Sequence, residues 1–119
     1  MPRPLVFVAS PWQGGPKGFR QYLTKAVADS FARGEAPIAS HGFYPRYLKD
    51  EGEDRELGLG CGLILLGRCD ILAVYADHGI TTGMQQEISY AAKHRIKVDW
   101  RYIMVKGPKW VAEENLDQS

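Results

Sequence analysis

Residues 71–94 read ILAVYADHGITTGMQQEISYAAKH, and this stretch decides the fold. Residues 71–75 are apolar and include β-branched and aromatic side chains, which is typical of a strand buried on both faces. Residues 76–81 then form a loop, and four apolar residues recur at helical spacing after it: Met84, Ile88, Ala91 and Ala92. A buried strand followed by an amphipathic helix is part of a β-α-β unit, so this stretch predicts a parallel sheet covered by helices.

The rest of the chain repeats this alternation. Apolar runs predict further strands at residues 5–9, 36–40 and from 96 to about 100, with an extension to 105 left open. Helical periodicity predicts helices over about 19–34, 54–68 and 83–94, and Thr82 and Gln85 have the capping-box spacing that starts the third helix. The pattern predicts an α/β fold: a three-layer α/β/α sandwich with a parallel, flavodoxin- or Rossmann-like sheet of four to five strands.

Length and composition fit an ordinary globular protein. The chain has 119 residues, of which 45% are hydrophobic and 24% charged. We expect residues 1–119 to form a single domain whose tail is partly irregular from about residue 106. The net charge of +1 argues against a partner that is a nucleic-acid polymer. The longest apolar stretch, 63–66, is too short to span a membrane, and the N-terminal run lacks a signal-peptide cleavage site, so we expect a cytoplasmic protein.

No cofactor or metal motif stands out. Cys61 and Cys69 form neither a Cys-x-x-Cys motif nor a disulfide framework, which predicts two buried thiols in a reducing compartment. The histidines at 41, 78 and 94 lack the His-Glu-x-x-His spacing of zinc enzymes. We therefore expect no cofactor and no metal, although a metal site assembled only in three dimensions stays open.

The loops that follow the strands are the places to look for a ligand. In open parallel sheets the ligand lies beyond the carboxyl ends of the strands, which nominates residues 10–16, 41–44 and 76–83. The glycines of the first loop either direct backbone N–H groups at an anion or make a plain tight turn. Glu87 falls in the second turn of the third helix, with its side chain directed back toward the strand ends. It is either a solvated surface carboxylate or a nucleophile that attacks C1′ of a sugar.

Several segments resemble the nucleoside 2-deoxyribosyltransferase-like superfamily. The resemblance is carried by Cys69-Asp70, Val74-Tyr75 and GITTGMQQEI at 79–88, followed by Ala91. The opening VFVASPW at 6–12 resembles the first strand and loop of that superfamily. PIASHGFYP at 37–45 and RELGL at 55–59 resemble a small, uncharacterised bacterial and phage branch of it. The resemblance implies the sandwich fold and chemistry at the N-glycosidic bond of a nucleoside or nucleotide.

It also implies roles for individual residues. Glu87 matches the family's catalytic glutamate, which forms a covalent deoxyribosyl intermediate, and Gly83 matches a loop glycine that lets a ligand approach the backbone. Thr81 stands where the transferases place an Asp for the sugar 5′-hydroxyl, and where related monophosphate N-glycosidases place a Ser for a 5′-phosphate. Gly14 and Gly15 resemble the phosphate-contacting loop of those hydrolases. The expected substrate-binding residues are Ser10, Trp12, Gln13, Gly14, Gly15, His41, Asp77, Thr81, Thr82, Gly83 and Met84.

The second helix departs from the family pattern. The family has an Asp in that helix, eight residues before the Asp that opens the third strand, and here that position is Gly62. Positioned acid–base help is typically worth about 10²- to 10⁴-fold, and His41, Asp77 or His78 are the candidates to replace it. The chain is therefore either an N-glycosidase or deoxyribosyltransferase that uses Glu87, or a non-catalytic nucleotide-binding protein. A third reading is an interaction protein that has kept only the fold.

Two further expectations concern the partner and the ligand. The second helix is apolar on more than one face (Leu57, Leu63, Ile64, Leu65 and Leu66) and carries closely spaced glycines, which predicts a homodimer through that helix. The neutral Thr81 lies at the entrance to the third helix, where the helix dipole favours an anion, and it predicts a ligand with a 5′-phosphate. Backbone N–H groups at Gln13 to Gly15 and the charge of Lys17 or Arg20 would assist.

Overall fold

The computed structural model describes residues 2–11, 17–49 and 51–104. Its sheet has four strands, all parallel, in the order β2-β1-β3-β4. The strands are β1 (Leu5–Ala9), β2 (Ala36–Ile38), β3 (Ile71–Tyr75) and β4 (Lys97–Arg101). The helices are α1 (Lys17–Ala32), α2 (Gly52–Leu66) and α3 (Thr82–Lys93), with two short 3₁₀ turns, η1 (Ser40–Gly42) and η2 (Tyr44–Arg46). The predicted α/β fold with a parallel sheet is confirmed.

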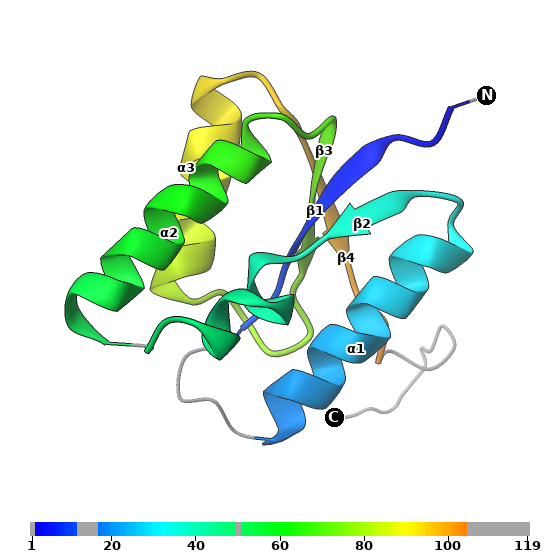
Figure 1. Ribbon diagram of the computed structural model, residues 1–119. Coiled ribbons are helices and arrows are strands. Elements are labelled where there is room, and N and C mark those ends of the chain that lie inside the picture. The colour runs from blue at the N-terminus through cyan, green and yellow to red at the C-terminus, as the bar shows by residue number, and fades with distance from the viewer. Residues whose placement is uncertain (1, 12–16, 50, 105–119) are drawn as a thin grey trace.

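The three layers follow from the alternation of side chains along the two central strands. On one face, Val6 and Val8 of β1 pack with Tyr75 of β3 against α1. On the other face, Phe7 and Leu72 pack against α2 and α3. Figure 1 shows α1 on one side of the sheet and the other two helices on the opposite side. Because both faces are covered, the central strands read as continuous apolar runs in the sequence.

The predicted boundaries differ from the observed ones at a few ends. The second strand stops at Ile38 instead of 40, because Ser40 already begins η1. The fourth strand runs from Lys97 to Arg101, and the possible end at 105 lies outside the described residues. Cys69 is buried, which raises the pKa of its thiol to about 11, but Cys61 is only half-buried. The prediction of two buried thiols is wrong for Cys61, because the fully buried positions of α2 are Gly62 and Leu66.

A buried polar network ties α1 to the sheet. Arg101 donates from Nη2 and Nη1 to the two carboxylate oxygens of Glu35, at 2.6 and 2.8 Å. Nη1 also lies 3.0 Å from the Tyr75 hydroxyl oxygen, and Ser30 donates to Glu35 at 2.7 Å. These hydrogen bonds, above all those from Arg101, hold the pKa of Glu35 below its ordinary value although burial opposes the shift. Helix α1 and strands β3 and β4 are therefore joined to Glu35, the residue that precedes β2, through these hydrogen bonds and the Arg101–Glu35 ion pair.

Over the described residues, no helix combines the length and the apolar character needed to cross a bilayer.

Candidate functional site

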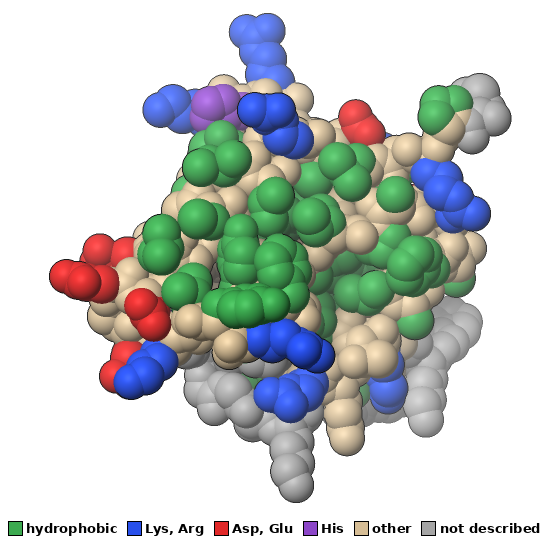
Figure 2. Space-filling view, viewed as in Figure 1, with side chains coloured by type: hydrophobic (Ala, Val, Ile, Leu, Met, Phe, Trp, Pro, Cys, Tyr) green, Lys and Arg blue, Asp and Glu red, His purple; other side chains and the backbone are tan. Residues whose placement is uncertain are grey.

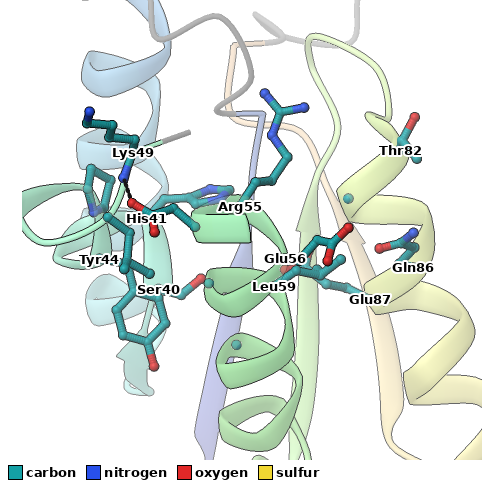
Figure 3. Close-up of a pocket in the computed structure, with 16 residues that line it drawn as sticks. Ser40, His41, Tyr44, Lys49, Arg55, Glu56, Leu59, Thr82, Gln86 and Glu87 are labelled. Atoms are coloured by element: carbon teal, nitrogen blue, oxygen red, sulfur yellow. Dashed lines mark hydrogen bonds between the residues drawn. The ribbon is translucent and has the colours of Figure 1, made fainter. Parts of the chain in front are cut away.

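A cavity of about 660 Å³ opens at the carboxyl edge of the sheet, between α2 and α3. Its walls come from the η1–η2 segment that follows β2, from the first turns of α2, and from the first turns of α3 (Figure 3). This is the edge that the rule for open parallel sheets nominates. Both acidic and basic side chains line the cavity: His41, Lys49, Asp54, Arg55, Glu56 and Glu87.

The start of α3 sets the position of Glu87. Thr81 has an extended backbone, and its Oγ1 accepts a hydrogen bond from the backbone N of Met84 at 3.2 Å. Thr81 is therefore the N-cap, and the prediction that Thr82 caps the helix is wrong: Thr82 is the first helical residue. With the helix started there, Glu87 falls in its second turn and faces α2 and the cavity.

Glu87 is a buried carboxylate. Its exposed fraction is 6%, so it is not the solvated surface residue that the sequence left as an alternative. Among the described residues, none makes a hydrogen bond or ion pair with it. Burial raises the pKa of Glu87 to about 8. An unpaired carboxyl buried at a cavity wall costs stability, and such groups are concentrated at functional sites.

The other predicted site residues divide into three groups. His41, Thr82 and Gly83 line the cavity with Glu87. Thr81 lies beside it as the cap of α3, whereas Met84 is a core residue with an exposed fraction of 1%. Ser10 is buried at the end of β1, and its hydroxyl has no hydrogen-bond partner in the described part of the chain. Four predicted residues lie outside the described residues: Trp12, Gln13, Gly14 and Gly15.

Asp77 and His78 lie on the α1 side, away from the cavity. The Asp77 carboxylate accepts the Tyr22 hydroxyl at 2.5 Å and the backbone N–H groups of Ile103 and Met104 at 3.0 Å each. The His78 ring packs edge-on against Tyr22, with 4.6 Å between the centroids. The structure does not support the prediction that Asp77 binds substrate, because its carboxylate oxygens are hydrogen-bonded to the backbone of the segment that follows β4. Of the three candidates to replace the missing helix Asp, only His41 lines the cavity.

Gly62 lies in the cavity wall, where α2 meets η1. A Cβ at this position would stand 3.4 Å from Ser40 Oγ and 3.9 Å from Phe7 Cζ, which is ordinary contact. The segment after β2 therefore packs closely against α2 at Gly62. This is the position at which the nucleoside 2-deoxyribosyltransferase-like superfamily has an Asp.

The first turns of α2 contribute cavity residues that the sequence patterns did not predict. Arg55, Glu56 and Leu59 line the cavity from this helix, and Gln86 lines it from α3. The predicted topology could have indicated these residues, because a helix that follows a parallel strand begins near the carboxyl edge of the sheet.

This chain matches one protein family in sequence and is similar in fold to solved structures. Residues 4–101 match the family described as Domain of unknown function (DUF7768). No curated protein is similar in sequence to this chain. Among solved structures, the 2-deoxyribosyltransferase of Bacillus psychrosaccharolyticus is similar with a TM-score of 0.67 and 16% identity, over 82% of this chain and 72% of that one. A 2-deoxyribosyltransferase from Leishmania mexicana gives 0.61 and 14%, over 85% of this chain and 65% of that one.

These likenesses establish a structural relationship through the fold, and the match over residues 4–101 shows that the chain belongs to the family Domain of unknown function (DUF7768).

Proposed function

We propose that this protein breaks the N-glycosidic bond of a nucleoside or deoxynucleoside 5′-monophosphate, as a hydrolase or a deoxyribosyltransferase, with Glu87 as the nucleophile. The observation that carries the proposal is the Glu87 carboxyl: buried, unpaired within the described residues, and facing a cavity at the carboxyl edge of the sheet. The fold shared with two 2-deoxyribosyltransferases supports it.

The chemistry proceeds by double displacement. A carboxylate oxygen of Glu87 forms a bond to C1′ while the C1′–N bond breaks and its electron pair leaves with the base. The product is a glycosyl ester on Glu87. Water or a second base then attacks C1′, and the electron pair of the ester C–O bond returns to Glu87. Positive charge that develops on the sugar during each step favours the ionised form of the carboxyl.

The pH dependence of the reaction follows from the burial of Glu87. Only the ionised carboxyl is a nucleophile, and its pKa in the free protein is raised to about 8. We therefore expect kcat/KM for base release to rise nearly tenfold per pH unit from pH 6.5 and to level off above about pH 8. Chromatographic measurement of free base at low substrate concentration tests this. A rate that is flat between pH 6.5 and 9 contradicts it.

Gly62 favours a second candidate, a nucleotide-binding protein without catalysis. With no side chain at this position, the leaving base loses a source of protonation. Soaking crystals in a nucleoside monophosphate separates the two functions. Free base and sugar phosphate in the density indicate catalysis, whereas an intact nucleotide indicates binding alone.

A 5′-phosphate on the ligand is supported by the chemistry of Thr81. Its Oγ1 accepts the capping hydrogen bond, so the hydroxyl proton remains available to an anion at the N-terminus of α3. We expect calorimetry to show a nucleoside 5′-monophosphate binding at least about tenfold tighter than the nucleoside, one hydrogen bond to a charged group being worth roughly 1.5–3 kcal/mol.

Thr81→Asp is the discriminating variant, because Asp caps helices well but repels a phosphate. We expect it to abolish the preference for the monophosphate, whereas Thr81→Asn, a neutral cap, keeps most of it. Equal binding of nucleoside and monophosphate by the unmodified protein, or an unchanged preference in Thr81→Asp, would show this assignment to be wrong.

We also propose that the protein forms a homodimer through α2. Leu63 and Leu65 are half-buried against the core, but Leu57 and Ile64 are 54% and 64% exposed. Figure 2 shows hydrophobic side chains gathered over α2 and the neighbouring η1–η2 segment. Gly60, with nothing near its Cβ position, lies between these two residues and allows close approach of another helix.

Light scattering at micromolar concentration should therefore give twice the chain mass of 13.3 kDa. Ile64→Glu should give the single-chain mass with an unchanged circular dichroism spectrum, because it places a charge in the contact. The unmodified protein scattering as a single chain would rule out the dimer.

A further inference from the structure

A second carboxylate lines the cavity opposite Glu87. Glu56 lies near the start of α2, and the close-up shows Glu56 and Glu87 projecting into the cleft from the two facing helices (Figure 3). Their surroundings differ. Glu87 is buried, whereas Glu56 is exposed, so water reaches its carboxylate. Helix α3 therefore presents the buried carboxyl of Glu87 to the cavity, and α2 presents the hydrated carboxyl of Glu56 to the same space.

We propose that Glu56 is the catalytic residue that activates water in the second half of the reaction, an inference that rests on the proposed function. The two half-reactions take place on opposite sides of C1′. Glu87 attacks one face of C1′, and the base leaves from the opposite face. The water that releases the sugar must enter where the base has left, on the side away from Glu87. That side is the α2 wall, which carries Glu56.

The other carboxylates and imidazoles that line the cavity or follow β3 fit this role less well. Asp54 also lines the cavity, but its Oδ2 accepts a hydrogen bond from the backbone N–H of Lys49 at 2.8 Å. This carboxylate therefore holds the loop before α2 in place. Asp77 and His78 lie on the α1 side. His41 lines the cavity from η1, whereas Glu56 lies on α2 and points toward α3, the helix that carries Glu87 (Figure 3).

Glu56 removes a proton from the water as the water oxygen bonds to C1′. The bond between C1′ and the Glu87 oxygen breaks, and its electron pair restores the Glu87 carboxylate. The sugar leaves with a hydroxyl at C1′, and Glu56 passes its proton to solvent.

Glu56→Gln tests the inference, because the side chain is exposed and the change removes only the charge. Glu53→Gln is the matched control, since Glu53 is an exposed residue of the first turn of α2, three positions before Glu56, and does not line the cavity. With a deoxynucleoside 5′-monophosphate, we expect Glu56→Gln to release about one base per site quickly and then to turn over about 10²- to 10⁴-fold more slowly than the unmodified protein. The intact mass should show the sugar phosphate attached to the protein.

Sodium azide should restore turnover in Glu56→Gln, because azide attacks C1′ without needing a base, and the product should be the glycosyl azide. Steady-state hydrolysis by Glu56→Gln at the rate of the control, with no attached sugar, overturns the inference while leaving Glu87 as nucleophile. Loss of the initial burst also overturns it, because Glu56 would then act in the first step. Absence of base release by the unmodified protein removes the proposed function itself.

Discussion

Glu87→Gln is expected to raise the free energy of unfolding by about 3 kcal/mol at pH 7 and to abolish base release. The stability gain follows from the pKa of about 8 that burial gives this carboxyl, against an ordinary value of 4.5. Between these two values the folded protein holds a proton that the unfolded chain releases. Each pH unit between 4.5 and 7 therefore costs the folded state about 1.36 kcal/mol, and a neutral Gln removes this cost.

The pH dependence makes this prediction specific. A group whose pKa is raised by folding leaves stability untouched below its unfolded value and lowers it as the pH rises toward 8. Urea unfolding should show Glu87→Gln and the unmodified protein equal near pH 4 and separated at pH 7 to 8. Glu53→Gln, an exposed change, should stay within about 0.5 kcal/mol of the unmodified protein throughout. A Glu87→Gln protein that is less stable at pH 8 would show that the carboxyl has a structural partner.

Arg101→Ala should lower the free energy of unfolding by about 3–5 kcal/mol, the second large effect. The variant leaves the Glu35 carboxylate buried without its two hydrogen bonds from the guanidinium. The Tyr75 hydroxyl loses a donor as well. Because Arg101 holds the pKa of Glu35 below its ordinary value, the stabilisation by this pair is present above that ordinary value and is lost as the pH falls through the lowered pKa.

The matched control for Arg101→Ala is Arg33→Ala. Arg33 pairs with Asp29 at 2.7 Å but is 43% exposed, and such pairs contribute about 0–1 kcal/mol. Thermal and urea unfolding of both variants check the contrast. An Arg101→Ala protein within about 1 kcal/mol of the unmodified one would mean that the buried pair is not what joins α1 to the sheet.

The fold was predictable because both faces of the sheet are covered. Phe7 and Val8 point to opposite helix layers, so β1 reads as an unbroken apolar run, and β3 has the same pattern. The helices differ from prediction only at their ends, because local hydrogen bonds determine at which residue a helix begins or stops. Thr81 rather than Thr82 caps α3 because its extended backbone lets its oxygen reach Met84, and no spacing rule separates two adjacent threonines.

The site was predictable only in part, because sequence neighbours of a loop can face opposite sides of the sheet. Asp77 directly follows β3 and Glu87 lies in the next helix, yet Asp77 binds the chain after β4 while Glu87 faces the cavity. Glu56 could not be singled out by composition, because an exposed helical Glu is common. Glu56 lines the cavity with Glu87 because α2 and α3 start side by side at the same edge of the sheet, and only the structure shows this.

Mass spectrometry of the trapped protein shows directly whether Glu87 is the nucleophile. The Glu56→Gln protein is mixed with a 2′-deoxynucleoside 5′-monophosphate, quenched in acid after about one turnover, and digested. We expect a deoxyribose 5-phosphate adduct on the peptide that contains Glu87, no adduct in a Glu87→Gln background, and an amount of free base equal to that of the adduct. Release of base with the adduct on another residue, or with no adduct and unchanged turnover in Glu87→Gln, would contradict it.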